Sequence, residues 1–125
     1  MEEKEASISE LCKQLGSGYR ILTIDLERCI YRDFGNGFNV EISGVNTKRK
    51  NHKASIYLWY GDSPPECLII KTVRGIDRTA AAISDEVERL YDYTVSLIHN
   101  GLNNRRDLMR IVQSRKIASA TDAHR

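Results

Sequence analysis

The sequence has no apolar run that approaches the ~20 residues a membrane-spanning helix needs, so we predict no membrane span. Its first residues, MEEKEAS, are acidic and lack the apolar core of a secretory signal. With 41% hydrophobic and 29% charged residues, the composition is ordinary for a globular protein. We therefore expect a cytoplasmic protein with one domain, residues 1–125, and a core of about residues 7–115.

Cysteine and histidine are few and scattered. The chain has three cysteines, an odd number, and no Cys-x-x-Cys spacing, so we interpret Cys12, Cys29 and Cys67 as free thiols rather than as disulfides or zinc ligands. The three histidines have no metal-ligand spacing either. We expect no metal and no cofactor.

Motifs of catalysis are also missing. The sequence contains no phosphate-binding Gly-x-x-x-x-Gly-Lys, no Gly-x-Ser-x-Gly and no His-Glu-x-x-His. Acidic residues at 25, 27, 33, 41 and 62 could join Lys71 in a metal nuclease centre, but their spacing matches no specific pattern. Alternating charge on the solvent face of strands explains them more simply, and we predict that the protein is not an enzyme.

What the sequence does contain is strand patterning around residues 31–60. Residues 38–43 and 54–60 alternate apolar and polar side chains, which is typical of strands with one buried face. Asn36-Gly37 predicts a tight hairpin turn before the first of these segments. Residues 19–34 alternate as well and predict one long strand, while residues 66–74 predict the last strand, after a Gly-Asp-Ser-Pro-Pro turn.

Arg28 interrupts the apolar register of the long strand 19–34. Two interpretations fit: a β-bulge turns Arg28 into solvent, or Arg28 is a functional cation that points toward a covered face.

Helical periodicity marks three further segments. A capping-box spacing from Ser7 predicts a short helix that Gly16 ends. Asp77 or Thr79 could cap a helix of about five turns that ends before Gly101. Asn103-Asn104 could then cap a final helix over about 104–115, and we expect residues 117–125 to form a mobile tail.

These elements predict the α+β class: a four-stranded, mostly antiparallel meander with a short N-terminal helix, a long helix packed on one face and a short C-terminal helix. One face of such a sheet stays open, with Tyr57 and Trp59 on it. Burying these side chains against a second copy is a natural solution, so we expect a homo-oligomer of at least two chains.

Two basic clusters are candidate sites for an anionic partner. Residues 48–50 and Lys53 form a cationic loop. Such a loop suits phosphate contacts without sequence specificity, and the alternative is that it only keeps the hairpin tip soluble. On the final helix, Asn103, Arg106 and Arg110 share one stripe and Arg105 lies at its flank. Arginine grips phosphate oxygens with two parallel donors, although a solvated face paired with Asp107 is the alternative.

The layout of residues 19–112, with YRDFGNGFNVEISG, KASIYLWY and the pair Arg106/Arg110, resembles the first type of Thoeris anti-defence proteins encoded by phages. The resemblance implies a non-catalytic, oligomeric sponge in the host cytoplasm that sequesters a nucleotide signal, a cyclic ADP-ribose isomer, with cyclic oligonucleotides as further ligands. Of the family's site, it assigns only the arginine pair. The ligand-binding set expected here is Arg106, Arg110, Asn103, Arg105, Arg28, Trp59 and Phe38, with Trp59, Phe38 and Tyr60 as candidates for stacking on the base.

The same strand-turn-strand region is also similar to some small anti-CRISPR proteins. That resemblance implies an inhibitor that binds a protein or nucleic-acid effector through the basic loop. Nucleic acid is therefore a second possible partner, after a small phosphate-bearing nucleotide.

Overall fold

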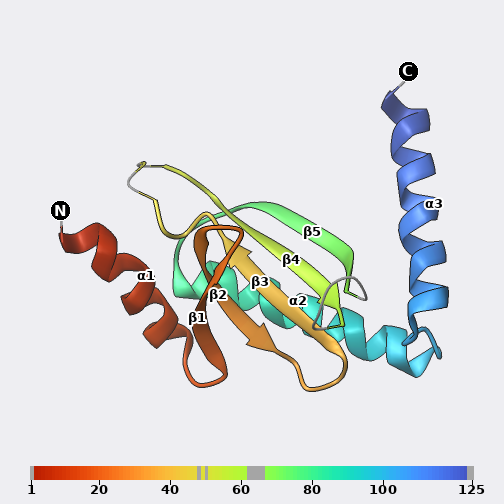
Figure 1. The fold of residues 1–125 in the computed structure, drawn as a ribbon, viewed down its shortest axis with the longest axis horizontal. Coiled ribbons are helices and arrows are strands. Elements are labelled where there is room, and N and C mark those ends of the chain that lie inside the picture. Colours follow the sequence, from red (N-terminus) through yellow and green to blue (C-terminus); the bar gives the residue numbers. More distant parts are fainter. Residues whose placement is uncertain (1, 48, 50, 62–66, 124–125) are drawn as a thin grey trace.

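The structure is a computed structural model that describes residues 2–47, 49, 51–61 and 67–123, with side chains described within residues 8–115 of those ranges. Within these ranges, three helices and five strands follow one another, as Figure 1 shows. Their order is α1 (Glu2–Leu15), β1 (Tyr19–Ile24), β2 (Glu27–Asp33), β3 (Phe38–Ser43), β4 (Ala54–Tyr60), β5 (Leu68–Ile76), α2 (Ala80–His99) and α3 (Arg105–Ala123).

The strands form one antiparallel sheet in the order β1-β2-β3-β4-β5. The predicted α+β class and the antiparallel meander are confirmed, but the number of strands is five and not four. The difference lies in residues 19–34, which form a hairpin rather than one strand. Asp25 and Leu26 make its two-residue turn, with φ of 49° and 67°, and Ile24 pairs with Glu27 across it.

This turn has the pattern of type I′, in which both central residues have positive φ. Asn-Gly is its usual sequence, and Asp-Leu gave no such signal. The hairpin contradicts both interpretations of Arg28, because the residue is exposed to solvent and no bulge puts it there. The β1–β2 register is continuous, and Arg28 is exposed opposite Thr23. The predicted bulge is therefore wrong, and the apolar alternation breaks because Asp25 and Leu26 form a turn.

The loop at Asn36-Gly37 is longer than the predicted two-residue turn. Four residues connect β2 to β3, and Phe34 N donates to the Phe38 carbonyl at 3.0 Å. Positive φ occurs at Gly35 and Gly37, whereas Asn36 uses its side chain. Its Oδ1 accepts from Phe38 N at 3.1 Å, and its Nδ2 donates to Thr94 Oγ1 at 3.0 Å, which ties the loop to α2.

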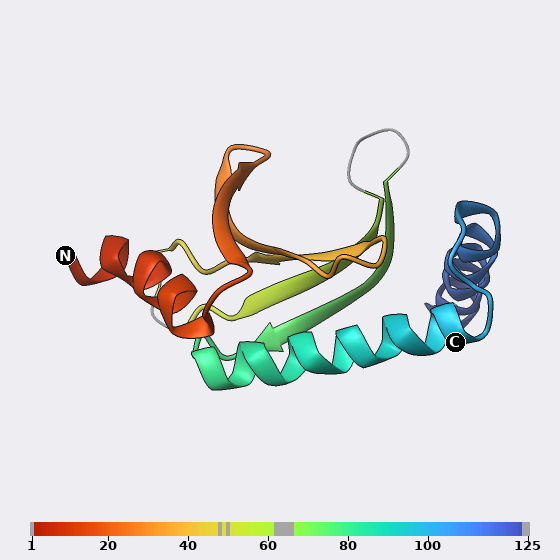
Figure 2. The same cartoon turned by 90° about the horizontal axis from the view of Figure 1, so that it is seen from below.

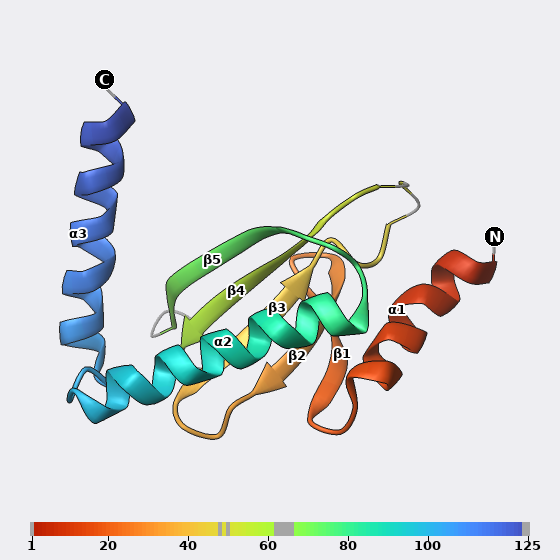
Figure 3. The ribbon, with the colours of Figure 1, turned by 180° about the vertical axis from the view of Figure 1, so that it is seen from behind.

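Helix α2 lies across one face of the sheet (Figures 1 and 3). Of the two candidate caps, Thr79 is the N-cap, and its side chain accepts from Ala82 N at 3.2 Å. At the other end Gly101 has φ of 75°, and Leu102 N donates to the Leu97 carbonyl at 2.8 Å, the Schellman pattern that favours glycine. Between helix and sheet lies the core, whose fully buried side chains include Ile30, Phe38, Val40, Ile42, Ile56, Leu58, Ile83 and Val87.

The sheet is strongly curved. The β1–β2 hairpin rises away from the side on which α2 lies, which leaves a concave face on the far side of β3 and β4 (Figure 2). Helix α3 stands at the end of α2 and contacts β5, and its Leu108 is fully buried in the core. Asn104 caps α3, since its Oδ1 accepts from Asp107 N at 3.0 Å. The helix continues to Ala123, beyond the residue 115 at which we expected it to end.

Candidate ligand-binding site

The concave face of the sheet carries a cavity of about 560 Å³, which we call the cup. Strand register explains its composition. Arg20 pairs with Tyr31, Tyr31 with Glu41, and Asn39 with Trp59, so these side chains project from one face of the sheet while their neighbours enter the core. Leu22, Ile24, Asp25 and Asp33 also line the cup.

Glu41 is a carboxyl group buried in the cup wall, with only 8% of its surface exposed. Trp59 Nε1 donates to one of its oxygens at 3.2 Å, and Cys29 Sγ lies 3.8 Å from the other. Burial raises the pKa of Glu41, the two hydrogen bonds oppose that shift, and the nearby carboxylates Glu27 and Asp25 add to it. Glu41 is therefore a proton-sensitive group in a fixed orientation.

Cys29 lies beneath Glu41 and is fully buried. Burial, followed by the negative charges of Glu41 and Glu27, raises the pKa of this thiol to about 12. A thiol with that pKa stays protonated at neutral pH, and the thiolate is the nucleophilic form. Cys29 can support Glu41 as a weak donor, but it is not an activated nucleophile.

Asn39 is the second buried polar residue of the cup, at 6% exposure. Its Nδ2 donates to the Gly61 carbonyl at 2.8 Å, which fixes the amide between β3 and the end of β4. Because Asn39 and Glu41 sit on the central strand with neighbours on both sides, their orientation is set by the sheet. The cup is thus preformed rather than assembled from loops.

The charge of the cup is mainly negative. The carboxyl groups of Asp25, Asp33 and Glu41 line it, against the guanidinium of Arg20, which lies 5.2 Å from the centre of the Tyr31 ring. A second hollow of about 300 Å³ adjoins the cup, because Ile24, Asp25, Glu41 and Trp59 line both. Together they offer hydrogen-bond acceptors beside aromatic and aliphatic walls, which suits a flat ligand that carries N–H donors.

Of the residues expected from sequence, Trp59 lines the cup and orients Glu41. Phe38 does not: its side chain is fully buried on the covered face, where it makes an edge-on contact with Tyr60 at 5.1 Å between ring centres. No face of that ring is open to a ligand. Arg28 is exposed on β2 and is not among the cup residues.

The predicted residues of the C-terminal helix lie elsewhere. Arg106 and Arg110 are exposed on α3, and Arg105 begins that helix. Asn103 accepts a hydrogen bond through its backbone carbonyl from Tyr60 Oη at 2.9 Å. Figure 2 shows α3 beyond the end of α2, and no described residue of α3 lines the cup. None of these four residues therefore shares the cup with Trp59.

Sequence reasoning missed most of the cup. Residues 39 and 41 were assigned to a solvent face by alternation, but curvature and two neighbouring strands bury them. The pattern did contain a signal. Neighbouring strands cover both flanks of a central strand, so outward-facing Asn and Glu side chains on it become partly buried.

Comparisons of the chain with protein-family models, curated proteins and solved structures gave no match. Within the described ranges, no helix is both long and apolar enough to cross a membrane, and no three metal-ligating side chains are grouped around a possible ion site.

Proposed function

We propose that this protein is a non-catalytic binding protein that captures a small nucleotide, with the base held in the cup. The observation that carries the proposal is the buried carboxyl of Glu41, which Trp59 holds in the wall of a preformed, acceptor-rich cavity. A volume of about 560 Å³ falls within the range of small-molecule sites.

The chemistry of a base complements this lining. Exocyclic amino groups and ring N–H groups donate to carboxyl oxygens, and the flat ring of a base can pack against the aromatic side chains of Trp59 and Tyr31. Asp25 and Asp33 disfavour a phosphate inside the cup. We therefore place the phosphates outside it, on the side of Arg20.

The resemblance to the first type of Thoeris anti-defence proteins supplies the candidate ligand, a cyclic ADP-ribose isomer, with cyclic oligonucleotides as further candidates. Capture of such a signal would block a bacterial defence without turnover. The protonated state of the Cys29 thiol supports a binding role over a nucleophilic one.

The alternative, an effector inhibitor that acts through its basic loop, has less support. Lys53 is paired with Asp77, and the Arg49 backbone carbonyl accepts from Arg78 at 3.0 Å, so parts of this loop serve local structure. Lys48 and Lys50 lie outside the described residues. The loop that holds Arg49 and helix α3 stand at opposite ends of the molecule, so their cations do not form one surface (Figures 1 and 3).

Calorimetric titration of cyclic ADP-ribose isomers and of adenosine and guanosine tests the proposal. Glu41→Gln, which keeps the shape of the side chain, should weaken binding at least tenfold, and Trp59→Leu should weaken it further. Arg106→Ala with Arg110→Ala is the matched comparison for the α3 stripe. If that double variant loses binding while Glu41→Gln does not, the site lies on α3 and the cup assignment is wrong.

Turnover is checked on the same complex. Heat release followed by chromatography should return intact ligand, and a hydrolysed product would contradict the non-catalytic role.

We also propose self-association, because apolar side chains such as Ile69 remain partly exposed on the open face. Light scattering at high concentration should give at least a dimer, and a mass of about one chain would exclude it.

A further inference from the structure

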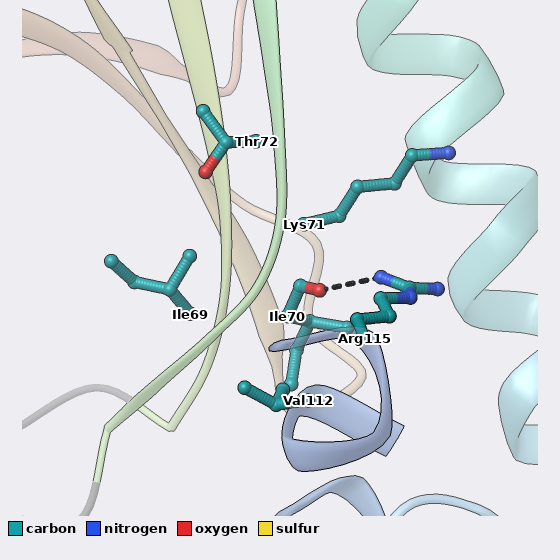
Figure 4. A pocket seen from close by; sticks show the side chains of 6 residues that line it. All are labelled: Ile69, Ile70, Lys71, Thr72, Val112 and Arg115. Atoms are coloured by element: carbon teal, nitrogen blue, oxygen red, sulfur yellow. Dashed lines mark hydrogen bonds between the residues drawn. The ribbon is translucent and has the colours of Figure 1, made fainter. Parts of the chain in front are cut away.

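A second hollow with different chemistry lies between β5 and α3. Its volume is about 530 Å³, and its lining consists of Ile69, Ile70, Lys71, Thr72, Val112 and Arg115. Figure 4 shows the side chains of Lys71 and Arg115 extending in the same direction, toward α2, whereas Ile69 and Thr72 lie on the other side of the strand.

Arg115 is held in a fixed position. Its Nη1 donates to the Ile70 carbonyl at 2.8 Å, and its Nη2 donates to Tyr93 Oη at 2.6 Å (Figure 4 draws the first bond). The guanidinium thus joins α3 to the free edge of β5 and to α2. Two of its five N–H donors are used in this way, and within the described part of the chain the other three have no hydrogen-bond partner and remain for a ligand.

Lys71 brings a second positive charge to the same place. Its Nζ lies 5.2 Å from the centre of the Tyr93 ring, and Arg115 Cζ lies 5.8 Å from that centre. Among the described side chains, no carboxylate forms a salt bridge with either cation, although three such pairs occur elsewhere. Two like charges that share one ring repel each other, and an anion between them would remove that repulsion.

We propose that Lys71 and Arg115 form a binding site for a phosphate group of a small molecule. A phosphate dianion matches two adjacent cations in charge, and arginine binds its oxygens with parallel N–H donors. Tyr93 supports the site by placing both cations. This site was not expected from sequence, because residues 71, 93 and 115 come from three elements that meet only in the folded chain.

The site stands apart from the base-binding proposal, and the two are tested with different probes. Adenosine has no phosphate and reports on the cup, whereas inorganic phosphate and phenyl phosphate have no base and report on Lys71 and Arg115. Loss of one activity with retention of the other separates the two assignments.

The experiment is a titration of the full chain with inorganic phosphate and phenyl phosphate, followed by ³¹P NMR. Lys71→Gln removes one cation without touching the Arg115 anchor and should weaken binding about tenfold, by loss of a charge-assisted contact. Arg74→Gln, an exposed cation on the same strand, is the matched control and should change binding less than twofold.

Arg115→Lys keeps the charge but loses the paired donors, and it should also weaken binding, with the melting temperature showing that α3 remains docked. The proposal is overturned if the parent protein binds neither probe at millimolar concentration, or if Arg74→Gln and Lys71→Gln reduce binding equally. It is also overturned if a single-stranded oligonucleotide binds through these residues while both small phosphates do not.

Discussion

Replacing Leu26 by glycine should stabilise the protein. Leu26 occupies the second position of the β1–β2 turn with φ of 67°, a conformation that costs an L-residue with a Cβ roughly 1–2 kcal/mol. Its side chain is 100% exposed, so it contributes no burial that the substitution could remove. Glycine relieves the strain at this position and creates the Asp-Gly dipeptide that two-residue hairpins favour.

The gain is smaller than the strain, because glycine also makes the unfolded chain more flexible, at a cost of about 0.4–1 kcal/mol. The net increase in the free energy of unfolding should be about 0.5–1 kcal/mol, which for a chain of this length corresponds to a melting-temperature rise of roughly 2–4 °C.

Leu26→Ala is the matched control, since alanine keeps the Cβ and the strain while it removes the apolar side chain. Its stability should stay within about 0.5 kcal/mol of the parent. Thermal melts followed by circular dichroism, with urea titrations for the free energies, provide the comparison. If the glycine variant is no more stable than the alanine variant, the backbone at Leu26 is not strained and the reasoning is wrong.

Three other predictions follow from the same structure. Burial raises the folded-state pKa of Glu41 above its ordinary value of 4.5, so the parent protein loses stability as pH rises from the unfolded-state pKa through the folded-state pKa. Glu41→Gln has no such ionisation, so its free energy of unfolding relative to the parent should be higher near pH 7 than near pH 4. The same relative stability at both pH values would contradict this. Gly44→Ala should lower the free energy of unfolding by more than Gly101→Ala, which should cost ~1–2 kcal/mol. The φ values of the two glycines are alike, 78° and 75°, but a Cβ at Gly44 would lie 2.9 Å from the Lys53 carbonyl oxygen. Equal urea midpoints for the two variants would refute this. Thiol-specific labelling of the native protein should leave Cys29 unmodified until the chain unfolds, and rapid modification would show that it is not buried.

Short-range chemistry made much of the fold readable from the sequence. The alternation in residues 38–43 and 54–60 defined β3 and β4 with their bounds, because a half-buried strand requires a period of two. Gly101 marked the end of α2 correctly, and Thr79 and Asn104, each one of two candidates, cap α2 and α3, because their side chains or backbone angles satisfy local groups. The capping box at Ser7 did not mark the start of α1, which begins at Glu2. The sequence did not indicate the turn at Asp25-Leu26, because the positive φ there goes against the backbone preference of leucine.

Tertiary structure decided where chemistry is possible. Alternation placed Asn39 and Glu41 on the correct face of the sheet, but only the curvature of five strands turned that face into an open cup and raised the pKa of Glu41 by burial. The family resemblance made Phe38 a candidate for stacking on a base, whereas alternation placed it on the apolar face, and the structure buries it fully. Lys71, Tyr93 and Arg115 are far apart along the chain, and no local pattern relates them. They meet because α3 docks on the edge of β5, where Arg115 reaches the Ile70 carbonyl and Tyr93.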